Sequence, residues 1–189
     1  MKSKRELLDE LQLRMERDTS LPLSTKLIFG EGSMDARICF IGEAPGAEEE
    51  KQGRPFVGRS GQLLRKTIRD IGWREEDVYI TNIVKRRPPE NRDPTPEEIA
   101  LYKPYLKEQL HILDPQVIVP LGRFAMNYFL PDAHISRDQG KTFLFHGKKI
   151  YPVFHPAAAL RSTGMMTAFV YALTQLPRVI DAERKSHET

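Results

Sequence analysis

The stretch ARICFIGEAPGAEEEKQGRPFVGRSGQLL, Ala36–Leu64, joins two apolar segments through a long polar one. Residues 36–41 are nearly all apolar, which predicts a strand buried on both faces. From Ser60, a suitable N-cap residue, the spacing of apolar residues predicts a helix to about Ile71. A plain connection between a strand and a helix needs only a few residues, so we expect the intervening loop to carry function.

The rest of the chain alternates between strands and helices. The other predicted strands cover 26–29, 77–82, 116–121 and 149–154, and the other predicted helices cover 2–17, 95–113, 122–129 and 165–183. This alternation is typical of a mostly parallel sheet with helices on both faces. No domain boundary is visible, so we expect one domain over residues 1–189, with helix 1–17 and tail 181–189 as extensions.

Composition limits the classes of protein to which the chain can belong. Its 189 residues carry a net charge of +3, and 40% are hydrophobic, which is enough for a core. The single cysteine, Cys39, excludes a disulfide framework and any site that needs several thiolates. No apolar run approaches the length of a membrane span, and the N-terminus has no signal-peptide core. We therefore expect an intracellular, cytoplasmic protein without membrane contact.

Three places in the chain are candidates for a ligand site. Ligands of such sheets bind at the carboxyl ends of the strands, where the loop 42–59, Asn82 and His155 are all expected. Phe56, in a loop stiffened by Pro55, can stack on a flat ligand. The amide of Asn82 offers a donor and an acceptor to one edge of a base, and His155 can donate to an anion. Each of these residue types is more often structural when taken alone, but together they predict a pocket for a planar heterocycle with a carbonyl.

Five segments, in chain order, resemble the motifs of the family 4 uracil-DNA glycosylases over about residues 27–162. They are GEAPGAEEEKQGRPFVGRSGQLL, YITNIVK, PPENRDPTPEE, VIVPLGR and FHPAAALR. The resemblance implies an α/β fold, a three-layer α/β/α sandwich around a central, mostly parallel four-stranded sheet. It also implies the excision of uracil from single- or double-stranded DNA, as in base excision repair.

The same resemblance implies roles for individual side chains. Phe56 corresponds to the ring that stacks on the flipped uracil, and Asn82 to the residue that reads its N3 and O4 edge. His155 corresponds to the donor to O2 of the departing uracil anion. Glu43 corresponds to the carboxylate that assists the water or the cationic sugar. Glu43 would stabilise the positive charge that develops on the sugar when the N-glycosidic bond breaks, and His155 would stabilise the negative charge on uracil.

Further contacts with the base and the DNA are implied by the same motifs. Gly42 and Gly46 would bring the backbone close to the base, and Glu49 would lie near its C5 atom. The residues implied to contact DNA are Lys85, Arg86 and Arg87 on phosphates, and Leu160 or Arg161 as a wedge in the minor groove.

One part of the family pattern is missing from this chain. Family 4 enzymes usually hold a [4Fe–4S] cluster through four cysteines, whose positions correspond here to Met15, Asp18, Arg86 and Tyr102. None of these side chains supplies a thiolate, so neither the cluster nor another metal is expected. We expect packing between Met15 and Tyr102, together with an Arg86–Asp18 ion pair, to take its place.

The residues leave three other functions open. The chain can be a uracil-DNA binding or trapping protein without turnover, a glycosylase of wider base specificity that accepts hypoxanthine or mismatched thymine, or a pseudoenzyme that bridges DNA and a repair partner. The retained Glu43 and His155 favour turnover, and Asn82 favours uracil. We expect a monomer that associates with the nucleoid when on DNA and that repair or replication proteins recruit.

Overall fold

A central sheet organises the fold. Residues 2–182 are those that the structure, a computed structural model, describes, and within them six strands form a sheet in the order β1-β3-β2-β4-β6-β5. The strands are β1 (Glu31–Gly32), β2 (Ile38–Gly42), β3 (Tyr79–Asn82), β4 (Val117–Pro120), β5 (Phe143–Phe145) and β6 (Lys148–Ile150). Strands β3, β2, β4 and β6 run parallel, whereas β1 and β5 pair antiparallel at the two edges.

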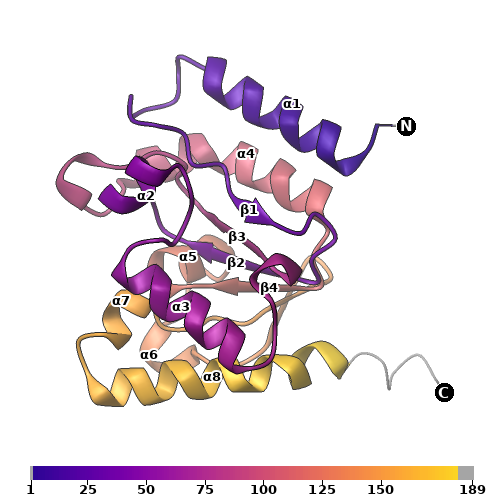
Figure 1. Ribbon diagram of the computed structural model, residues 1–189, viewed down its shortest axis with the longest axis vertical. Helices are drawn as coiled ribbons and strands as arrows, with labels where there is room; N and C mark the ends of the chain where they lie inside the picture. The colour runs from indigo at the N-terminus through magenta and orange to yellow at the C-terminus, as the bar shows by residue number, and fades with distance from the viewer. Residues whose placement is uncertain (1, 183–189) are drawn as a thin grey trace.

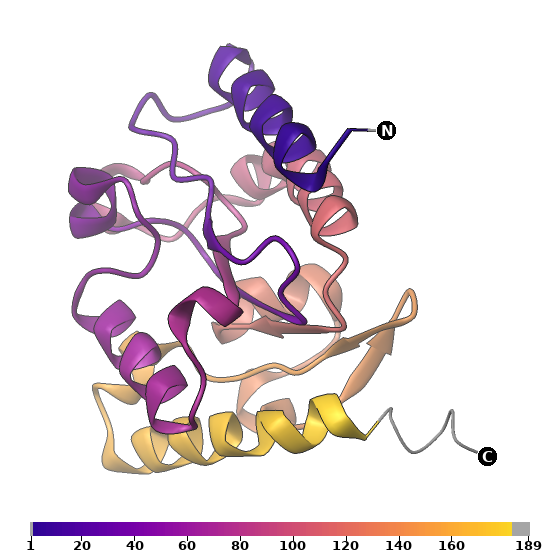
Figure 2. The ribbon, with the colours of Figure 1, turned by 45° about the vertical axis from the view of Figure 1, so that its right-hand side comes forward.

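Helices cover both faces of this sheet (Figures 1 and 2). In chain order they are α1 (Lys4–Arg17), α2 (Ala47–Gln52), α3 (Arg59–Asp70), α4 (Pro96–Leu113), α5 (Gly122–Phe129), α6 (Ile135–Asp138), α7 (Pro156–Ala159) and α8 (Thr163–Asp181). Helices α1, α4 and α5 contribute to the core on one face, and α3, α7 and α8 to the core on the other. The predicted three-layer α/β/α arrangement is therefore confirmed.

Strand β2 contributes to the core on both faces of the sheet. All five of its residues are buried. Ile38 and Phe40 point toward α3 and α8, whereas Cys39 and Ile41 point toward α1 and α4. Successive side chains of a strand point to opposite faces, so a strand between two helical layers must be apolar throughout. The burial on both faces that the opening stretch predicts is thus confirmed.

The prediction of a four-stranded sheet is wrong at both edges of the sheet. Strand β1 is only two residues long, too short to leave a periodic pattern, and the strand expected at 26–29 is irregular chain that precedes it. Strand β5 pairs with β6 through a tight hairpin in which His146 and Gly147 both have positive φ. Two-residue turns of this type usually have the sequence Asn-Gly or Asp-Gly, so His-Gly did not clearly indicate a hairpin.

The first and last helices of the described residues lie close to the predicted ranges 2–17 and 165–183. Helix α1 begins with a capping box in which Ser3 and Glu6 each bond the other's backbone. Helix α8 ends at Asp181, and residues 183–189 of the predicted tail 181–189 lie outside the described residues. In the described part of the chain, no helix is both long and apolar enough to cross a membrane.

The positions that correspond to cluster ligands lie where α1 packs on α4. Met15 and Tyr102 are wholly buried and belong to the core on this face, as the predicted packing requires. The Tyr102 hydroxyl donates to the carbonyl of Pro22 at 2.9 Å, which ties α4 to the chain that follows α1. A buried phenol with a satisfied hydroxyl behaves as a core residue.

The predicted Arg86–Asp18 ion pair is wrong. Asp18 instead accepts a hydrogen bond of 2.5 Å from the Tyr105 hydroxyl. Arg86 donates to the carbonyl of Thr25, and its guanidinium lies beside the Tyr102 hydroxyl. A thioether, an engaged carboxylate, a guanidinium and a buried phenol do not fit an iron–sulfur cluster. Among residues 2–182 there is also no group of three His, Cys, Asp or Glu side chains placed to hold a metal ion.

We expect truncation of Met15 to destabilise the protein substantially. Because its side chain is wholly buried, Met15→Ala should lower the free energy of unfolding by about 2–4 kcal/mol. The matched control is Leu13→Ala on the same helix, where the side chain is 43% exposed, and its cost should stay below about 1 kcal/mol. Urea unfolding measures both values. Equal costs for the two variants would contradict the packing role of Met15.

Candidate active site

A pocket of about 470 Å³ opens at the carboxyl ends of the parallel strands. This is the edge of the sheet at which the topology predicts a ligand. Six residues that sequence places around the base line the pocket together: Glu43, Gly46, Glu49, Phe56, Asn82 and His155. They come from the residue after β2, the N-cap and first turn of α2, the loop between α2 and α3, the end of β3, and the N-cap of α7. The fold therefore brings them together, although more than a hundred residues separate the first from the last.

Gly42 lies beneath the pocket rather than on its wall. A Cβ atom at Gly42 would lie 2.4 Å from Cζ of Phe56 and 2.4 Å from Oδ1 of Asn82. Both distances are far inside van der Waals contact, so only glycine permits the two side chains to occupy these positions. Gly42 therefore makes a steric contribution to the site, and the approach of its backbone to the base stays a prediction.

Asn82 is buried at the end of β3 with part of its hydrogen-bonding capacity unused. The side chain is 2% exposed, and among the described residues its Oδ1 atom has no hydrogen-bond partner. A buried acceptor without a partner costs free energy, and native structures rarely retain one without a reason. Since Asn82 lines the pocket, a ligand that offers an N–H group would satisfy it.

His155 is a neutral hydrogen-bond donor in this pocket. It is the N-cap residue of α7, and its Nδ1 atom accepts a hydrogen bond of 3.1 Å from the backbone N–H of Ala157. Nδ1 therefore carries no proton, and the neutral ring has its proton on Nε2. Burial lowers the pKa of His155 to about 4, so the ring is uncharged at neutral pH.

The pKa of Glu43 is shifted in the opposite direction to that of His155. Burial and the neighbouring carboxylate of Asp93 raise the pKa of Glu43 to about 7, against a weaker opposing effect of Arg123. Asp93 lines the pocket and pairs with Arg123 at 3.2 Å. The sequence reasoning missed Asp93, although it lies within the quoted PPENRDPTPEE segment.

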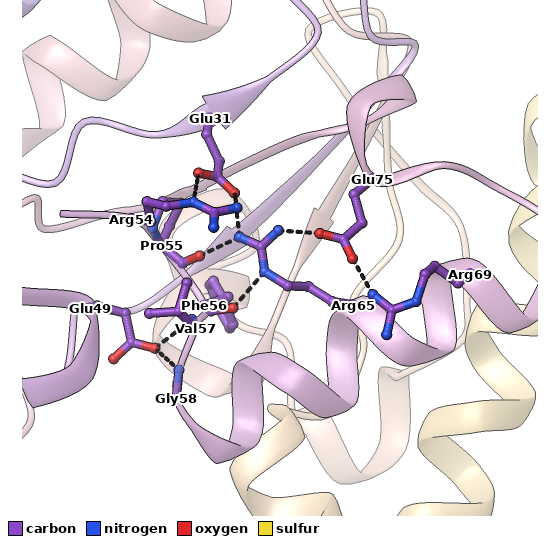
Figure 3. Close-up of polar contacts among 10 residues, drawn as sticks. All are labelled: Glu31, Glu49, Arg54, Pro55, Phe56, Val57, Gly58, Arg65, Arg69 and Glu75. Carbon is purple, nitrogen blue, oxygen red and sulfur yellow. Dashed lines mark hydrogen bonds and ion pairs between the residues drawn. The ribbon is translucent and has the colours of Figure 1, made fainter. Parts of the chain in front are cut away.

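Glu49 is occupied by backbone amides (Figure 3). One carboxylate oxygen accepts from Val57 N at 2.9 Å and from Gly58 N at 2.8 Å. The other accepts from Gly46 N at 3.1 Å, which closes the start of α2. Glu49 thus links the two ends of the long loop. It lines the pocket, but its oxygens already serve the loop that holds Phe56.

The prediction that Lys85 contacts DNA is wrong. Its side chain is wholly buried, and Nζ donates to Thr81 Oγ1 and, at 2.6 Å, to Gln109 Oε1. Burial lowers the pKa of Lys85 to about 7. The amino group of Lys85 therefore ties the end of β3 to α4, and its burial keeps it away from a phosphate.

The other predicted DNA-contacting residues are only partly free. Arg86 and Arg87 are half-buried, and Arg87 pairs with Glu50 at 3.0 Å. Leu160 follows α7 and is half-buried, whereas Arg161 is exposed and lines the pocket. Of these residues, only Arg161 lines the pocket.

The match to a family model identifies the family of this chain. The model of the Uracil DNA glycosylase superfamily matches residues 29–176, which include every pocket residue named above. The chain belongs to this superfamily.

Within the superfamily, the chain is similar to the Type-4 uracil-DNA glycosylases. It is 45% identical over 168 residues to that of Thermotoga maritima, a match that covers 86% of this chain and 88% of the relative. It is 48% identical over 145 residues to that of Archaeoglobus fulgidus, with 72% and 73% covered. A Type-5 uracil-DNA glycosylase of Thermus thermophilus is 30% identical over 167 residues, with 77% and 76% covered.

We expect Glu43→Gln to stabilise the protein at alkaline pH. The folded-state pKa of Glu43, about 7, lies above its ordinary value of 4.5. The folded protein therefore holds the Glu43 proton more tightly than the unfolded chain does. The contribution of Glu43 to the free energy of unfolding is fully present below pH 4.5 and is lost as the pH rises through 7. At pH 8 the variant should be more stable than the native protein by about 1–2 kcal/mol, allowing for the partly exposed position of Glu43.

Urea unfolding at pH 8 and at pH 4.5 measures this difference. The stabilisation should disappear at the lower pH, and Glu48→Gln, at an exposed position nearby, should change stability little at either. The same gain at both values of pH would contradict the raised pKa of Glu43.

Proposed function

We propose that this chain is a uracil-DNA glycosylase that flips uracil out of DNA and hydrolyses its N-glycosidic bond without an iron–sulfur cluster. The product would be an abasic site, the intermediate of base excision repair. The observation that carries the proposal is the buried, unpartnered Oδ1 of Asn82 in a pocket shared with Phe56 and His155. The superfamily and the similarity to Type-4 uracil-DNA glycosylases support the same activity.

The pocket suits the edge of uracil that distinguishes it from cytosine. Oδ1 of Asn82 would accept from N3–H of uracil, and Nδ2 would donate to O4. Cytosine presents an acceptor at N3 and a donor at N4, so both hydrogen bonds would be lost. A base inside a duplex is out of reach, so it must be rotated out, and stacking on Phe56 would offset part of that cost.

His155 would stabilise the leaving group. Cleavage leaves negative charge on uracil, and Nε2–H of His155 would donate to O2 of that anion. A neutral imidazole is a suitable donor here, because its low pKa leaves the ring uncharged at neutral pH. A neutral imidazole is also a very weak acid, so it hydrogen-bonds to the anion without transferring its Nε2 proton. The hydrogen bond from Ala157 to Nδ1 fixes the tautomer that this role needs.

Glu43 would act at the sugar. The departing base leaves positive charge on the sugar ring, which a carboxylate stabilises while it orients the attacking water. Only the ionised form can do so. Since the pKa of Glu43 is about 7, its active fraction would rise through neutral pH.

The contacts with DNA beyond the base are proposals of the same kind. Arg161 and Leu160 would enter the minor groove beside the flipped nucleotide, and Arg86 and Arg87 would lie near phosphates. We further propose a cytoplasmic monomer that binds single- or double-stranded uracil-DNA and that repair or replication proteins recruit. The absence of a cluster rests on the side chains at the four ligand positions.

Release of uracil from an oligonucleotide with one uracil tests the proposed function. Protein purified without added iron should produce alkali-labile abasic sites in the single- and double-stranded substrate. His155→Ala should reduce the rate roughly 100-fold or more, because it removes the donor to the leaving anion. The matched control is His111→Ala, an exposed histidine on α4, which should retain the native rate.

Two negative results have distinct meanings. No product despite tight binding to uracil-DNA would favour a binding or trapping protein. Neither product nor binding would contradict the assignment altogether.

A further inference from the structure

The backbone at Phe56 has a conformation that needs outside support. Its φ is 52°, in the left-handed region that disfavours residues with a Cβ atom. The ring forms part of the pocket wall, and its centroid lies 5.9 Å from that of the His155 ring. Because the backbone sets the direction of the side chain, the placement of the ring depends on whatever holds this turn.

Arg65 of α3 holds the turn from one side (Figure 3). Its side chain is only 8% exposed. Nε donates to the carbonyl of Phe56 at 2.7 Å, and Nη2 donates to the carbonyl of Pro55 at 2.6 Å. A charged donor makes stronger hydrogen bonds than a neutral one, especially when it is shielded from water. Two successive carbonyls are therefore fixed by a single guanidinium group.

Two glutamates fix the guanidinium group itself. Glu75, in the turn before β3, accepts from Nη1 at 2.6 Å, and Glu31 of β1 accepts from Nη2. The same carboxylates pair on their outer sides with Arg69 and Arg54. A planar group with several donors can serve two carbonyls and two carboxylates at once, which an ammonium group cannot do in the same geometry.

The other side of the turn is held by Glu49 and by a close approach to α3. Glu49 accepts from the amides of Val57 and Gly58, the two residues after Phe56. A Cβ atom at Gly61 would lie 2.1 Å from the carbonyl carbon of Phe56, so glycine is needed where the turn rests on the helix. The carbonyls are thus held by Arg65 and the following amides by Glu49.

We infer that Arg65 is a positioning residue for the stacking ring of Phe56, held in orientation by Glu31 and Glu75. This inference rests on the proposed function, since the ring is taken to stack on uracil. Arg65 donates to the backbone of the turn that carries the ring and to the two carboxylates, and it does not itself line the pocket. Pre-ordering this turn removes a cost that binding of the flipped base would otherwise carry.

A double-mutant cycle tests this inference. Arg65→Lys keeps the positive charge but loses the planar guanidinium group that donates to both carbonyls and both carboxylates. It should slow single-turnover release of uracil roughly tenfold. In a Phe56→Ala background the same substitution should change the rate less than about twofold, because Arg65 acts through the ring. The matched control is Arg69→Lys, on the same helix and paired with Glu75 but without contact to the turn, which should leave the rate unchanged.

Two results would overturn the inference. One is an equal loss from Arg65→Lys in the presence and absence of the Phe56 ring, which would mean a general effect on the fold. The other is no loss in either background. If Arg65→Lys does not fold, Glu31→Gln takes its place in the cycle. Glu31→Gln should slow uracil release by less than Arg65→Lys, and this slowing should disappear in the Phe56→Ala background. If the slowing persists in that background, the inference is overturned.

Hydrogen exchange gives a readout that does not need activity. The amides of Val57 and Gly58 should exchange faster in Arg65→Lys than in Arg69→Lys, because the turn is released on its carbonyl side. Equal exchange in the two variants would overturn the inference. If the native protein releases no uracil, the proposed function fails, and this measurement still decides whether Arg65 holds the turn.

Discussion

The site depends on the close approach of two side chains over Gly42. Strand β2 ends there, between β3 and β4, and the Phe56 ring and the Asn82 amide both occupy the space that a Cβ atom would need. The ring arrives from the loop before α3 and the amide from the end of β3. Burial of β2 on both faces fixes the position of Gly42, and the missing side chain lets the other two residues meet above it.

Burial in the pocket shifts the pKa values of two groups, Glu43 and His155, in opposite directions. Burial disfavours the charged form of any titratable side chain, so it raises the pKa of Glu43 and lowers that of His155. Asp93 adds to the shift of Glu43, and the amide of Ala157 fixes the tautomer of His155. A carboxylate with a pKa near neutrality and a neutral N–H donor therefore line the same pocket. The proposed reaction needs such a pair, because it develops opposite charges on sugar and base.

Much of this arrangement could be predicted from the sequence. The apolar run of β2 and the alternation of elements gave the layers, and the long motifs led to Phe56, Asn82 and His155. Local sequence patterns could not show which basic side chains are exposed to solvent. Lys85 lies in a basic run but is buried among polar partners on β3 and α4. Nor could they reveal Arg65, whose partners come from β1, the long loop and the turn before β3.

The most direct test of this account is the rate of uracil release by Gly42→Ala. One methyl group at this position must displace the ring or the amide, so the rate should fall roughly 100-fold while the protein remains folded. Gly164→Ala is the matched control, because a Cβ atom there would meet only Ser162 Oγ, at 3.8 Å. A Gly42→Ala protein that releases uracil as fast as this control would contradict the account.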